Sequence, residues 1–279
     1  MASVRRRRVA YNPMTRSLTD YAAYLFDVDG TLLHPGATIP GAIEALEALK
    51  AHGKAIRAVT NNSRMAHHRV AERFRRFGLP LDDDEVFSAL TATARFIAHE
   101  RPGATVFPFG ADGLVYELEA AGLTVTDRDN AEYVVAGYFP EISVESMTTA
   151  MRALLGGARF IAVNTDRRYP GADGPIPGAG AFVAAIERAA GREPDVIVGK
   201  PSITIVQEAV TSVGLPASEC LFIGDNIETD VLAAHSVGLS ALLVWTGVST
   251  PDDLAASGVQ VAHVGDSVAA LAEAFAAPR

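Results

Sequence analysis

Short apolar runs alternate with amphipathic segments along most of the chain, and this alternation predicts an α/β fold. The candidate buried strands lie at 23–27, 54–60, 220–224 and 240–245. The segments with apolar residues at helical spacing, each closed by a glycine, lie at 39–53, 64–78, 203–214 and 227–238. Strands that alternate with helices form mostly parallel sheets covered on both faces. The sequence therefore predicts a Rossmann-like, mostly parallel core sheet.

The middle of the chain continues the alternation but is predicted to form a second, smaller α/β domain. Its candidate strands are at 104–110, 123–126, 133–138 and 159–164, with helices near 111–121 and 143–155. The Gly- and Pro-rich segment 167–180 predicts a linker back to the core, where 195–199 is predicted as a further strand. The predicted domains are a basic tail at 1–19, core at 20–86 and 179–279, and an inserted cap at 87–178.

Composition narrows the class of protein. The chain has 279 residues, 49% hydrophobic and 20% charged, so it can bury a large core. A net charge of −9 disfavours a nucleic-acid partner, and no apolar run approaches the roughly 20 residues that cross a bilayer. The single cysteine, Cys220, excludes an intrachain disulfide and fits a cytoplasmic location. The tail with RRRR at 5–8 is interpreted as a solvated terminus rather than a transit peptide.

Polar groups follow the predicted strands at their carboxyl ends, where ligands of open α/β sheets bind. These groups are Asp27, Asp29 and Gly30 after the first strand, Thr60 and Asn61 after the second, Lys200 after the strand at 195–199, and Asp225 with Asp230 after the strand at 220–224. Each motif alone is more typical of a turn, loop or helix cap. We expect all of them to open on the same edge of the core sheet, and that convergence favours a reaction centre.

The chemistry of this set fits phosphoryl transfer. Asp27 and Asp29 are two residues apart on a strand and share a face, so one can attack phosphorus while the other protonates a leaving oxygen. Clustered carboxylates repel one another unless a cation offsets them. Mg²⁺ and the Lys200 ammonium are the natural offsets, and Thr60 with the amides near Asn61 can hold phosphate oxygens.

The motifs DVDGTL, VTNNS, VGKP and GDNIETD resemble, in this order, the four signature motifs of the haloacid dehalogenase superfamily. The insert between Thr60 and Lys200 resembles a type C2 cap. With IPGA after the first motif and LLVWTGVST near the end, the chain resembles subfamily IIA, the NagD-like and p-nitrophenyl-phosphatase-like branch.

This resemblance implies a role for each matching residue. Asp27 would be the nucleophile, Asp29 the acid and base, and Lys200 the group that stabilises nucleophile and phosphate. Phosphate would be bound by Thr60, Asn61, Lys200 and the backbone near Gly30. Mg²⁺ would be held by Asp27, by the backbone carbonyl of Asp29 and by Asp225, and Asp230 would support the metal site without being a ligand itself. An acid at Asp29 is typical of phosphatases and mutases and is lacking in dehalogenases of this superfamily. Asn226 stands where many relatives have a basic residue, which affects one local ion pair.

The sequence gives several candidate residues for contacts with the substrate. Asp166, in the cap segment NTDRRYP, resembles an acidic residue common there. Arg167 and Arg168 are candidate contacts to an anionic or hydroxylated substrate, with a solvated loop equally compatible. His34 is a candidate cap-facing residue, although a surface loop is the more typical reading.

The sequence thus predicts a Mg²⁺-dependent phosphatase that hydrolyses small phosphate monoesters through an aspartyl-phosphate at Asp27. One alternative is a phosphotransferase or mutase acting on sugar phosphates, and another is a non-catalytic regulatory protein that keeps the Mg²⁺ and phosphate site. A response-regulator receiver has no place for an insert of this length. The expected partner is a small phosphorylated metabolite, and a homodimer is an option that the sequence does not decide.

Overall fold

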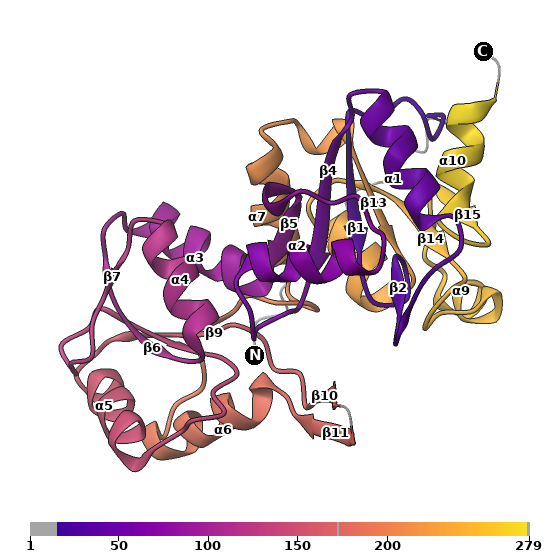
Figure 1. Ribbon diagram of the computed structural model, residues 1–279. Helices are drawn as coiled ribbons and strands as arrows, with labels where there is room; N and C mark the ends of the chain where they lie inside the picture. Colours follow the sequence, from indigo (N-terminus) through magenta and orange to yellow (C-terminus); the bar gives the residue numbers. More distant parts are fainter. Residues whose placement is uncertain (1–15, 172, 278–279) are drawn as a thin grey trace, which may run out of the picture.

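The computed structural model describes residues 16–171 and 173–277, and it contains two parallel sheets (Figure 1). The larger sheet has six strands in the order β15-β14-β13-β1-β4-β5, and all its neighbours pair in parallel. These strands are β1 (Ala23–Asp27), β4 (Ala55–Thr60), β5 (Val86–Ser88), β13 (Cys220–Gly224), β14 (Ser240–Val244) and β15 (His263–Gly265). The predicted Rossmann-like core sheet is confirmed.

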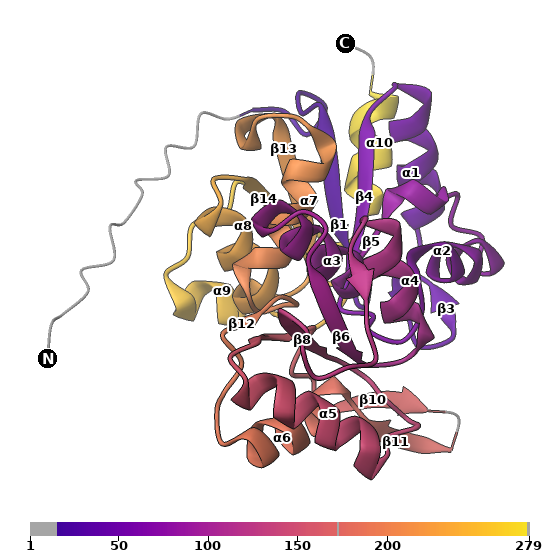
Figure 2. The same cartoon turned by 90° about the vertical axis from the view of Figure 1, so that its left-hand side faces the viewer.

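Helices cover both faces of this sheet, as Figure 2 shows. Side chains of the central strand β1 point alternately to the two faces, so each face is apolar and needs a covering layer. Tyr24 and Phe26 of β1 point to one face, and Ala23 and Leu25 to the other. The first face packs on α1 (Ala42–Ala51), α2 (His67–Arg76) and α10 (Ala269–Ala276), and the second on α3 (Ala89–Glu100), α7 (Ile203–Val213) and α8 (Leu232–Ser236). Burying each large apolar side chain contributes about 1.5–3 kcal/mol, which holds the layers together.

The smaller sheet forms a second unit at the lower left in Figure 1. Its five strands follow the order β12-β9-β8-β6-β7. They are β6 (Thr105–Phe109), β7 (Thr124–Val125), β8 (Tyr133–Ala136), β9 (Arg159–Ala162) and β12 (Val196–Ile197). Helices α5 (Val144–Leu155) and α6 (Ala179–Ala190) pack on one face, while α4 (Asp112–Ala120) packs on the other. The predicted second, smaller α/β unit is present.

The remaining elements are short. They comprise the hairpin strands β2 (Leu33–His34) and β3 (Ala37–Thr38), the hairpin strands β10 (Arg168–Gly171) and β11 (Gly174–Pro177), and α9 (Pro251–Ser257). A π-helical turn at Ile227–Val231 leads into α8. The helix predicted near 143–155 is α5, and the Ser143 side chain caps it by accepting a hydrogen bond from the backbone of Ser146.

Two sequence predictions about residues 167–199 are wrong. The strand predicted for the core at 195–199 is β12, and it pairs with β9 of the smaller sheet. The predicted linker at 167–180 contains the β10–β11 hairpin and the start of α6. A short apolar strand carries no local mark of the sheet it joins, since sheet membership depends on distant partners.

The domain limits of 87 and 178 stay a prediction. Two elements that follow residue 178 contact the smaller sheet: α6 packs on it, and β12 pairs with its strand β9. The RRRR run of the predicted tail lies outside the described residues. Among the helices of the described ranges, none is long and apolar enough to span a membrane.

Candidate active site

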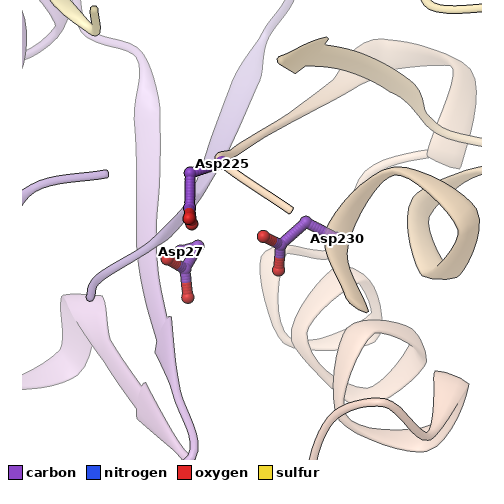
Figure 3. A group of neighbouring side chains, drawn as sticks. All are labelled: Asp27, Asp225 and Asp230. Carbon is purple, nitrogen blue, oxygen red and sulfur yellow. The ribbon is translucent and has the colours of Figure 1, made fainter. Parts of the chain in front are cut away.

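Three buried carboxylates meet at the carboxyl edge of the larger sheet. Asp27 ends β1, Asp225 follows β13, and Asp230 lies on the π-helical turn before α8. Figure 3 shows Asp225 and Asp230 directed toward Asp27. One oxygen from each lies within 4.8 Å of the others, and the three residues are only 6%, 2% and 1% exposed. The sequence-based expectation that Asp27, Asp225 and Asp230 converge is therefore met.

Lys200 supplies positive charge to this cluster. Its Nζ contacts Oδ1 of Asp27 and donates to Oδ1 of Asp230 at 3.2 Å. Burial by itself lowers the pKa of Lys200, but the charges of Asp230 and Asp27 outweigh it, so the pKa is raised and the ammonium stays charged. Burial also raises the pKa of Asp230, against the opposing effect of Lys200.

The same cluster fits a divalent cation. Three carboxylates face one ammonium, which leaves an excess of negative charge, and burial followed by the Asp27 charge raises the pKa of Asp225. Within the described residues, Oδ2 of Asp27 is buried without a hydrogen-bond partner. Octahedral Mg²⁺ has oxygen ligands at about 2.1 Å, so neighbouring oxygens are about 3 Å apart, which a cluster of this size can reach with small adjustments. Both Asp230 oxygens already accept hydrogen bonds, from Lys200 and from the Asn226 backbone.

Asp29 faces a different space, a cavity of about 320 Å³ between the larger sheet, α2 and the smaller unit. Solvent reaches Asp29 there, yet the surrounding protein desolvates the carboxylate, and together with the Asp27 charge this raises its pKa. A raised pKa suits a group that must carry a proton to a leaving oxygen. The cavity is lined by Val28, Asp29, Leu33, Thr60, Asn61, Asn62, Ser63, Arg64, Val70, Arg73, Phe74, Asp166 and Tyr169.

The Asn61 side chain connects several parts of the site. Its Oδ1 accepts from the Lys200 backbone at 2.8 Å, and its Nδ2 donates to the Lys200 carbonyl at 3.0 Å and to Asp166 at 3.3 Å. Asn164 of the smaller unit donates to the Asn61 carbonyl at 2.7 Å. An added Cβ on Gly199 would lie 2.7 Å from Asn164, so a glycine is needed for this close approach. The Asn61 side chain thus positions Lys200, while phosphate binding by Asn61 stays a prediction.

Sequence reasoning missed the loop after β14, which covers Asp225. Thr246 donates to the Gly30 carbonyl at 2.6 Å, and the Val248 backbone donates to Oδ2 of Asp225, also at 2.6 Å. A Cβ on Gly247 would lie 1.9 Å from Asp225, and one on Gly30 would lie 2.7 Å from it. The signal was available, because this Gly- and Thr-containing segment also ends a core strand on the carboxyl edge.

Not every predicted substrate contact lies at this cavity. Asp166 lines it, together with Tyr169, which the sequence prediction did not include. Arg167 lies on a separate hollow beside α6, Arg168 is exposed on β10, and His34 is exposed at the β2–β3 hairpin. The chain turns after Asp166, so neighbouring residues there face different ways, and spacing alone could not separate them.

Comparison with known proteins assigns this geometry to a family. A family model of haloacid dehalogenase-like hydrolases matches residues 24–124, and a second model of similar hydrolases matches residues 197–271. A dihydroxyacetone phosphatase of Corynebacterium glutamicum is 34% identical over 261 residues, which are 94% of this chain and 94% of that protein. The chain belongs to the haloacid dehalogenase-like hydrolases. The resemblance read from the four motifs is confirmed.

Solved structures of this hydrolase family share the whole arrangement. A p-nitrophenyl phosphatase from Archaeoglobus fulgidus is 43% identical, with a TM-score of 0.80 over 91% of this chain and 99% of that one. NagD from E. coli K-12 is 33% identical, with a TM-score of 0.81 over 89% and 97%. These neighbours confirm the predicted NagD-like and p-nitrophenyl-phosphatase-like branch.

Proposed function

We propose that this chain is a Mg²⁺-dependent phosphatase that hydrolyses small phosphate monoesters through an aspartyl-phosphate at Asp27. The observation that carries the proposal is the buried cluster of Asp27, Asp225, Asp230 and Lys200, next to a cavity that contains a second acid, Asp29. The membership of the family and the phosphatases among its similar proteins support the reaction class.

In the first step a carboxylate oxygen of Asp27 attacks phosphorus, and the bond from phosphorus to the ester oxygen breaks. Lys200, bonded to the other oxygen of Asp27, orients the nucleophile and offsets the negative charge of the arriving phosphate. Asp29 gives its proton to the departing ester oxygen, which leaves as an alcohol.

In the second step Asp29, now a carboxylate, takes a proton from a water molecule that attacks the phosphorus of the aspartyl-phosphate. The bond between phosphorus and Asp27 breaks, inorganic phosphate leaves, and both aspartates return to their starting states. Thr60 is buried and lines the cavity, and its hydroxyl would donate to phosphate oxygens.

Asp27, Asp225 and the backbone carbonyl of Asp29 would hold Mg²⁺. The Asp230 carboxylate, which accepts hydrogen bonds from Lys200 and from the Asn226 backbone, would support the site. When bound, the ion would neutralise charge on the phosphoryl oxygens. The cavity of about 320 Å³ is at the lower end of the roughly 300–1,000 Å³ usual for ligand pockets, which favours a small leaving group.

The decisive experiment replaces the nucleophile. The Asp27→Asn variant should lose Mg²⁺-dependent phosphate release from a chromogenic aryl phosphate. It should still show a cooperative thermal unfolding transition, which demonstrates that the variant is folded. Asp252→Asn, the same chemical change at an exposed position on α9, is the matched control and should retain activity. Chelation of Mg²⁺ should abolish release by the wild type, and re-addition should restore it.

Mass spectrometry of acid-quenched reactions should detect a phosphorylated wild-type chain and none in Asp27→Asn. Substantial turnover by the variant would refute Asp27 as the nucleophile. If the phosphoryl group is transferred to an added sugar and little free phosphate forms, the protein is a phosphotransferase and not a phosphatase.

A further inference from the structure

Two arginines on the α2 side of the active-site cavity have no carboxylate partner among the residues that the structure describes. Arg64 precedes α2 and Arg73 lies on it, and both line the cavity. Other arginines of this helix, Arg69, Arg75 and Arg76, each have a carboxylate oxygen within 3.1 Å. Within the described ranges, Arg64 and Arg73 have none within 4.0 Å. The cavity wall therefore carries two guanidinium groups that form no ion pair with any described carboxylate.

The two arginines line the cavity that Asp29 faces, and Asp29 is the acid proposed to protonate the leaving group. The phosphoryl side has its own cation in Lys200, which is buried and does not line the cavity. The Arg64 guanidinium lies 5.2 Å from the ring centroid of Tyr138 in the smaller unit, a contact that holds it at the junction of the two units. Arg73 is close enough to Asp29 for its charge to oppose the rise in the pKa of that acid.

We propose that the substrate of this phosphatase carries a second anionic group on its leaving group, a carboxylate or a second phosphate, which Arg64 and Arg73 bind. The inference rests on the proposed function and names the substrate class of that same site. A guanidinium group donates two parallel, charge-assisted hydrogen bonds to a carboxylate or phosphate. Its hydrogen bond to a neutral sugar hydroxyl is weaker. Asp166 lines the same cavity, and its carboxylate would disfavour an anion close to it, which leaves the two arginines as the favourable contacts.

The test compares three esters of equal carbon length: glycerol 3-phosphate, 3-phosphoglycerate and glycerol 1,3-bisphosphate. Their tails end in a hydroxyl, a carboxylate and a second phosphate, so the two anionic esters distinguish the two sources of charge. We expect the wild type to prefer at least one anionic ester over glycerol 3-phosphate by about tenfold or more in kcat/KM, mainly through KM.

In Arg73→Gln and Arg64→Gln this preference should fall by about tenfold. Arg76→Gln removes the same charge from the same helix outside the cavity and should keep the preference. Equal kcat/KM values for the three esters in the wild type would overturn the inference while leaving the phosphatase intact. Equal losses on all three esters in the variants would also overturn it, because the arginines would then serve the common phosphoryl group. Failure to hydrolyse any of the three, while an aryl phosphate is still hydrolysed, would overturn the inference and leave the proposed function standing.

Discussion

At the scale of single residues, the buried contact of Lys200 with Asp27 and Asp230 dominates the site. All three side chains are less than 10% exposed, so water does little to screen their charges. Burying charges is costly by itself, and removing one partner is worse, because it leaves the others uncompensated. This makes the site a source of both reactivity and stability.

We therefore predict that Lys200→Met lowers the free energy of unfolding by about 3 kcal/mol at neutral pH with a chelator present. It should also reduce turnover at least about 100-fold, since a cation that offsets transition-state charge is lost. Urea denaturation and a phosphate-release assay measure the two effects. Lys50→Met is the control, because Lys50 forms partly exposed ion pairs with Asp82 and Glu85, and its loss should cost at most about 1 kcal/mol.

At the scale of elements, helix α2 depends on α4 for its start. Its N-cap residue is Ala66, which has no side-chain oxygen to accept from the first helical amides. The buried Glu117 of α4 replaces that cap by accepting from the His67 backbone at 2.6 Å and from its ring at 2.8 Å. The helices can meet so closely because Gly113 has no Cβ, which would lie 2.7 Å from the Ala66 nitrogen.

Glu117→Ala should therefore destabilise the protein by about 1–2 kcal/mol, the usual value of a lost helix cap. Glu117→Gln keeps an acceptor and should lose less than about 1 kcal/mol. Both are measured by urea denaturation. Glu119→Ala, an exposed change on the same helix, should shift stability by no more than about 0.5 kcal/mol. If all three variants are equally stable, Glu117 does not cap α2.

At the scale of the whole molecule, the smaller unit docks on the loop after β4. Tyr169 donates its hydroxyl to Asn164 at 3.1 Å and shares a 2.7 Å hydrogen bond with Ser63, while Asn164 binds the Asn61 carbonyl. These contacts close one side of the cavity and bring Asp166 to it. Closure that excludes water from the reacting groups strengthens their electrostatic interactions.

We predict that Tyr169→Phe lowers kcat/KM for an aryl phosphate about 5–10-fold, since two hydrogen bonds worth about 0.5–1.5 kcal/mol each are lost at the docked interface. The thermal unfolding temperature should fall by about 2–4 °C for each kcal/mol lost. Tyr116→Phe removes the same hydroxyl from an exposed tyrosine of α4 and should leave kinetics unchanged. Wild-type kinetics in Tyr169→Phe would show that this contact does not matter for turnover.

Local pattern was sufficient to predict much of this protein. The buried strands of the larger sheet and its helices were predicted from the periodicity of apolar residues and from the glycines that end helices. This works because burial and backbone conformation constrain which residues stand at neighbouring positions. The carboxyl-edge rule also predicted that Asp27, Thr60 and Asp225 gather at one site. The motif order allowed the family to be recognised, and the comparisons confirm it.

Only the tertiary structure decided which sheet β12 joins, which residues of the 164–170 segment face the cavity, and how the β14 loop covers Asp225. The physical reason is the same in each case. These features depend on partners tens to hundreds of residues away, and a strand, a turn or a charged side chain has nearly the same local sequence whichever partner it meets. The aspartates were therefore predictable from the sequence, whereas Asn164, Tyr169 and the two unpaired arginines became visible only once the chain was folded.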